Sequence, residues 1–92
     1  MSSVAVPIDE IELARQGYLD ELKADGESGE RFTPGSFGCH ELLDRTSLLT
    51  DSLERFVLSH PACVHNKEWF ALAYQAVSHL NDLYQKVGAE HV

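Results

Sequence analysis

The chain has 92 residues, 43% of them hydrophobic and 24% charged, with 15 acidic and seven basic side chains and a net charge of −8. This composition is that of one globular domain and argues against wholesale disorder. The charge disfavours nucleic-acid phosphates and anionic membranes as partners. A domain this small buries only about 60–65% of its unfolded surface, so self-association is expected to add stability.

The acidity is concentrated near the N-terminus. Residues 1–30 hold eight acids and two bases, a net −6, whereas residues 31–92 hold seven acids and five bases, a net −2. Such a lopsided distribution favours a basic protein partner.

Targeting signals and disulfides are both unexpected in this sequence. No apolar run approaches the ~20 residues of a membrane span, and residues 1–6 lack the basic start of a signal peptide. Two cysteines, Cys39 and Cys63, are too few for a disulfide framework. These features predict a cytoplasmic protein with reduced thiols.

A first helix is expected near residues 8–24. Pro7 suits the first turn, and Ile8, Ile11, Tyr18 and Leu22 follow helical spacing. A flexible polar break over 26–30 then leads into a turn-rich connector that carries Phe32 and Phe37. These rings suggest that the connector packs against the helices.

A second helix is predicted from about 37 to 60, beginning near Ser36 and stopped by Pro61. Its apolar stripe comprises Leu42, Thr46, Leu49, Leu53, Phe56 and His60. Residues 61–66 are expected to form a short connection, with Asn66 as the N-cap of the next helix.

A third helix is predicted over about 67–87, with Gly88 as its end. Its stripe comprises Trp69, Ala73, Ala76, Leu80, Leu83 and Val87, widened by Phe70, Val77 and Tyr84. This apolar arc is broader than one neighbouring helix can cover.

The pattern therefore predicts an all-α fold built on a long antiparallel helical hairpin (36–92) preceded by an acidic helix and connector (1–35), together one domain. The first helix completes a three-helix bundle, or a second copy completes a four-helix bundle. We favour the homodimer.

No catalytic constellation is identifiable, so we expect a non-enzymatic interaction module, of the inhibitor, antitoxin-like or adaptor type. Its partner-facing elements are expected to be the acidic helix and the aromatic connector. The residues assigned to partner binding are Glu10, Glu12, Asp20, Glu21, Phe32 and Phe37.

An alternative is a metal site at the hairpin turn. His60, Cys63 and His65 lie within six residues, and three such ligands could hold zinc with water or a fourth ligand. Cys39, His40 and His91 are expected to gather at the other end of the hairpin, about 31 Å away. If no metal binds here, no cofactor is expected.

Overall fold

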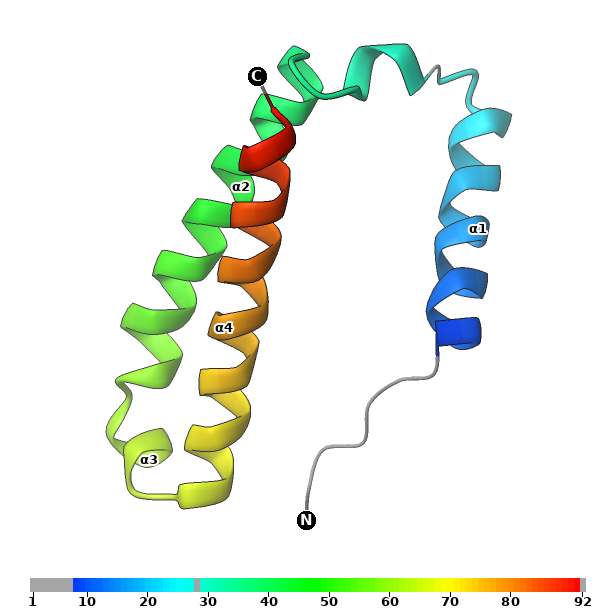
Figure 1. The fold of residues 1–92 in the computed structure, drawn as a ribbon. Coiled ribbons are helices and arrows are strands. Elements are labelled where there is room, and N and C mark those ends of the chain that lie inside the picture. The colour runs from blue at the N-terminus through cyan, green and yellow to red at the C-terminus, as the bar shows by residue number, and fades with distance from the viewer. Residues whose placement is uncertain (1–7, 28, 92) are drawn as a thin grey trace. The chain divides into compact units, whose positions relative to one another are not determined.

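A computed structural model of the protein describes residues 8–27 and 29–91. Every regular element in these residues is a helix, which confirms the all-α prediction (Figure 1). The chain divides into two compact units, residues 1–31 and 32–92, and each is described by itself. That the two form one domain stays a prediction.

The first unit contains helix α1 (Ile8–Ala24), with the predicted bounds. Asp9 and Glu10 lie in its first turn and Lys23 in its last. Each charge is therefore near the end of the helix dipole that has the opposite sign, which stabilises the helix. The helix ends before Gly26, whose φ of 79° is a conformation that glycine adopts without strain. Pro7 and Ser28 lie outside the described residues.

The second unit begins within a 3₁₀ turn, η1 (Gly29–Phe32), and is dominated by helices α2 (Phe37–Leu53) and α4 (Lys67–Glu90). The Ser36 hydroxyl accepts the Cys39 N–H at 3.1 Å, and the Asn66 side chain accepts the Trp69 N–H at 3.1 Å. These caps satisfy backbone donors at both helix starts. Helix α2 packs along α4, which confirms the hairpin (Figure 1).

The turn of the hairpin differs from the prediction of one helix reaching residue 60. Helix α2 ends at Leu53 and continues as a π-helical segment, η2 (Glu54–Leu58), where the Ser59 N–H bonds to the Glu54 carbonyl at 3.2 Å. A short helix α3 (Pro61–Val64) follows. Pro61 starts this helix because its missing N–H is not required at a first helical position.

The C-terminal helix is longer than predicted. Gly88 was expected to end it, yet α4 continues to Glu90, and Gly88 does not adopt a positive φ. A Cβ added at Gly88 would lie 4.0 Å from Leu43 Cδ2. Gly88 therefore lies within a helix that packs beside α2, and the end of α4 is set three residues later by His91.

The core between α2 and α4 is small. The buried residues of the hairpin are Cys39, Thr46 and Thr50 on α2, Cys63 on α3 and Val77 on α4. The stripe predicted for α2 is therefore wrong in part, because Leu42, Leu49 and Phe56 are 45%, 59% and 66% exposed. Thr46 and Thr50 can be buried since their hydroxyls bond to the Leu42 and Thr46 carbonyls, each at 2.7 Å.

Candidate functional site

One side of the hairpin carries a series of exposed hydrophobic side chains, which we call the apolar face. Leu42 and Leu49 are seven residues apart on α2 and therefore lie on one side of that helix, and Phe56 follows in η2. The members of the apolar face are 42–66% exposed: Leu42, Leu49, Phe56, Val57, Trp69, Leu72 and Leu83.

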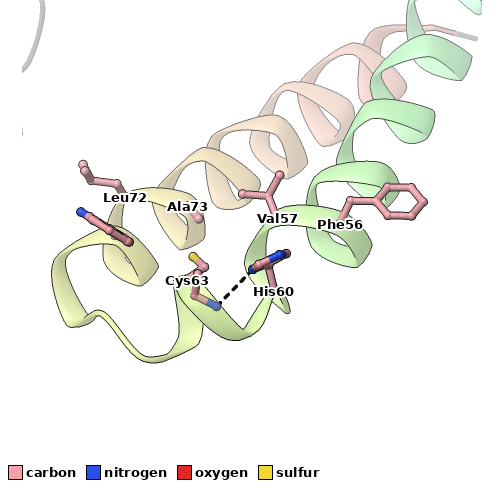
Figure 2. A pocket seen from close by; sticks show the side chains of 8 residues that line it. Phe56, Val57, His60, Cys63, Leu72 and Ala73 are labelled. Atoms are coloured by element: carbon pink, nitrogen blue, oxygen red, sulfur yellow. Dashed lines mark hydrogen bonds between the residues drawn. The ribbon is translucent and has the colours of Figure 1, made fainter.

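The apolar face is hollowed at the turn end of the hairpin. The hollow has a volume of about 550 Å³ and is open to solvent. Figure 2 shows its walls coming from the end of η2, from α3 and from the start of α4. The lining residues are Phe56, Val57, His60, Ala62, Cys63, Trp69, Leu72 and Ala73. None of them is an aspartate, glutamate, lysine or arginine.

The opposite side of the hairpin, the polar face, has a different chemistry. Two smaller depressions there, of about 290 and 260 Å³, are lined largely by hydroxyl, amide and carboxylate groups. Their polar residues are Ser47, Thr50, Asp51, Glu54, Tyr74, Ser78, Asn81, Asp82, Tyr84 and Gln85. The contrast makes the hairpin amphipathic as a whole and leaves one face suited to apolar contact.

The extent of the apolar face is unusual for a surface. Half-exposed Leu, Phe and Trp side chains present on the order of 100 Å² each, so its members expose roughly 700 Å². The largest apolar patch on a typical monomer is about 300–600 Å² and is often functional. A stable protein interface buries about 600–1,000 Å² per partner. The face is therefore large enough for an interface.

The proposed zinc ligands have separate structural roles at the turn. His60 caps α3, where its Nδ1 accepts the Ala62 N–H at 3.1 Å, as the dashed line in Figure 2 shows. Cys63 is buried and lines the hollow with His60, whereas His65 is exposed at the end of α3 and does not. Among the described residues, no three His, Cys, Asp or Glu side chains form a group suited to a metal ion.

The other predicted cluster, at the open end of the hairpin, joins the connector to the C-terminus. His91 Nδ1 accepts the Gly35 N–H at 2.8 Å, and the rings of His40 and His91 have centroids 5.8 Å apart. His40 also lies 3.5 Å from an Asp44 carboxylate oxygen. The histidines thus meet as predicted, with Cys39 buried beside His40 in the chain.

The acidic residues assigned to partner binding all lie on α1 and are exposed. Glu10 and Glu21 are eleven residues apart, close to three full turns, so they lie along one side of the helix. Asp20 lies beside Glu21 in the sequence. These three carboxylates form an exposed negative surface.

Glu12 differs from the other acids of α1 because it is occupied by local partners. Arg15 donates from Nε at 2.9 Å and also contacts it through Nη2, and Gln16 donates at 3.2 Å. The hydrogen bonds from Arg15 and then Gln16 lower the pKa of Glu12 from 4.5 to about 2. Arg15 largely compensates its charge, so Glu12 adds little to the negative surface.

The two connector phenylalanines lie in different settings. Phe37 is the first residue of α2 and is 78% exposed, whereas Phe32 ends η1 and is 47% exposed. Neither lines the hollow. Sequence reasoning had assigned partner contact to these rings and had not identified Leu72 or Val57, which do line it.

Comparison with known proteins adds no relative. No protein-family model, curated protein or solved structure matches the chain. Within residues 8–27 and 29–91, none of the helices is both long enough and apolar enough to cross a membrane.

Proposed function

We propose that the protein is a non-enzymatic interaction module that binds polypeptides through the apolar face of its hairpin. The observation that carries the proposal is the contrast between the two sides of the same helices. Leu49 is 59% exposed on one side, whereas Ser47 and Asp51 line a polar depression on the other. The free energy falls when a partner covers an apolar surface of this extent and removes it from water.

The test compares two double variants in an affinity capture experiment. Leu49→Glu with Leu72→Glu places two carboxylates on the apolar face. Ser47→Glu with Ser78→Glu places the same two charges on the same helices, on the polar face. The bait is the tagged chain, and recovered polypeptides include an untagged copy of the chain.

We expect a stoichiometric polypeptide to be recovered with the wild-type chain and the polar-face variant. The apolar-face variant should lose it by at least about tenfold, because a carboxylate buried without a partner disfavours the complex. Equal recovery by all three chains would contradict the proposal.

The acidic helix supports a second part of the proposal, a basic partner attracted by charge. Complementary potentials raise association rates by about 10–10³ and act over about 10 Å at 0.1 M salt. The exposed carboxylates of Glu10, Asp20 and Glu21 provide such a potential on α1. The charge on α1 thus favours a basic partner, and this second part of the proposal does not depend on what covers the apolar face.

This part is tested with a lysine-rich peptide and a matched pair of triple variants. Glu10→Gln, Asp20→Asn and Glu21→Gln reduce the net charge from −8 to −5, since three negative charges are removed. Glu54→Gln, Asp82→Asn and Glu90→Gln do the same on the hairpin. Stopped-flow mixing should show a several-fold slower association for the α1 variant at low salt. Equal slowing by both variants would show that only net charge matters.

A further inference from the structure

We infer that the occupant of the apolar face is a second copy of this chain, so that two hairpins form a four-helix assembly. The inference rests on the proposed function and names the partner of the same face. It follows from four features of the hairpin: its small core, the equal rows of the face, its uneven relief and its paired charges.

The small core shows that the hairpin is underburied. Val77, Cys39 and Cys63 are its buried apolar residues, whereas Phe37, Phe56, Trp69 and Tyr74 are each more than half exposed. A fully buried Leu, Val or Phe contributes about 1.5–3 kcal/mol, while ordering each residue costs about 1–2 kcal/mol. A hairpin with so few buried side chains gains much of its stability by covering the remaining apolar face.

The dimensions of the face suit a copy of itself. Its row on α2 and η2 runs from Leu42 to Phe56, and its row on α4 runs from Trp69 to Leu83. The first and last members of each row are fourteen positions apart, about 21 Å of helix. In a two-fold contact the same patch serves both sides, so the roughly 700 Å² presented by each copy approaches the about 800 Å² of a standard interface.

The relief of the face is self-complementary as well. The hollow of about 550 Å³ lies at the turn end, while Leu42 and Leu49 project nearer the open end. In an antiparallel two-fold contact, the turn of one hairpin lies beside the open end of the other. The leucines of each copy then lie over the hollow of the other. Packed assemblies of this kind fill such gaps with side chains from facing helices.

The charges next to the face do not oppose this contact. Arg45 and Glu41 pair at 3.2 Å within α2. Two copies therefore approach without bringing unpaired like charges of these residues together, which would cost affinity. Most of the acidity of the chain lies in residues 1–30 and not in the hairpin.

The test is sedimentation equilibrium of the wild-type chain from about 1 µM to about 1 mM, a range that covers moderate to weak affinities. We expect a reversible dimer. Leu49→Glu with Leu72→Glu should raise its Kd by at least about tenfold, whereas Ser47→Glu with Ser78→Glu should leave it within about twofold. Circular dichroism checks that each variant keeps its helix content.

A wild-type chain that stays monomeric throughout this range overturns the inference, whether or not the variants fold. If that monomer still captures another protein through the apolar face, the proposed function stands and only the second copy is wrong. A dimer weakened equally by both double variants also overturns it, because the contact would then not lie on this face.

Discussion

Helix α1 and the hairpin are held by different kinds of interaction. No residue of α1 is buried, and its described side-chain contacts, such as Glu12 with Arg15, lie one turn apart in the sequence. Helix α4 instead buries Val77 against α2 and has a side-chain cap at Asn66. Local pairs contribute only about 0.2–0.5 kcal/mol each, whereas burying a side chain contributes about 1.5–3 kcal/mol.

A helix can therefore be predicted correctly without being stabilised in the same way as its neighbour. Short isolated helices are marginal in water, since nucleation is unfavourable and each added hydrogen bond contributes little. The hairpin is therefore expected to respond strongly to changes in its core, and α1 to changes in intrinsic helix propensity. Two substitutions separate these cases.

The larger effect is expected at Val77, which is 7% exposed. Val77→Asp places a carboxylate without a partner between α2 and α4, at a cost of about 3–5 kcal/mol. Thermal unfolding followed by circular dichroism should show the hairpin transition lost or strongly lowered. Ser78→Asp, on the polar face, is the control and should change stability by less than about 0.5 kcal/mol. Similar effects of both would mean that this core does not hold the hairpin.

A smaller effect is expected at Gly17, in the middle of α1. A Cβ at this position meets nothing within 4 Å, and Gly17 does not adopt a positive φ. Gly17→Ala should therefore favour the helix by about 1 kcal/mol. Backbone chemical shifts should report a higher helical population over residues 8–24 with the hairpin unchanged. Gly88→Ala, whose Cβ would contact Leu43, should instead raise the unfolding temperature of the hairpin. An unchanged helical population of α1 in Gly17→Ala would contradict the comparison.

Much of the fold could be predicted from local patterns. Helical spacing and the turn at Gly26 defined α1, and Asn66 marked the start of α4. The turn and the C-terminal end depended on tertiary context. Pro61 is equally compatible with stopping one helix and starting another, and Gly88 remains helical inside a helix that packs against α2.

The candidate site was predicted only in outline. The broad apolar arc predicted for the last helix contained Val77, the residue of α4 that is buried, but it did not separate that residue from Trp69 and Leu83, which are exposed. The stripe predicted for α2 contained Thr46, which is buried, together with Leu42 and Leu49, which are exposed, and it left out the buried Thr50. The sequence alone does not say which side of this stripe α4 covers. The seven-residue recurrence of Leu42, Leu49 and Phe56 was the available signal for a second contact surface.

The two buried threonines have a consequence for the alignment of the hairpin. Thr46 and Thr50 each bond to a carbonyl of their own helix, so these hydroxyls require no particular hydrogen-bonding group on α4. A buried polar pair between helices fixes their register, and these two residues do not provide one. Besides the packing of side chains, the axial register of α2 against α4 is constrained at the ends, by α3 at the turn and by the Gly35–His91 hydrogen bond at the opening. The connection through α3 and the Gly35–His91 hydrogen bond thus limit the sliding of α2 along α4.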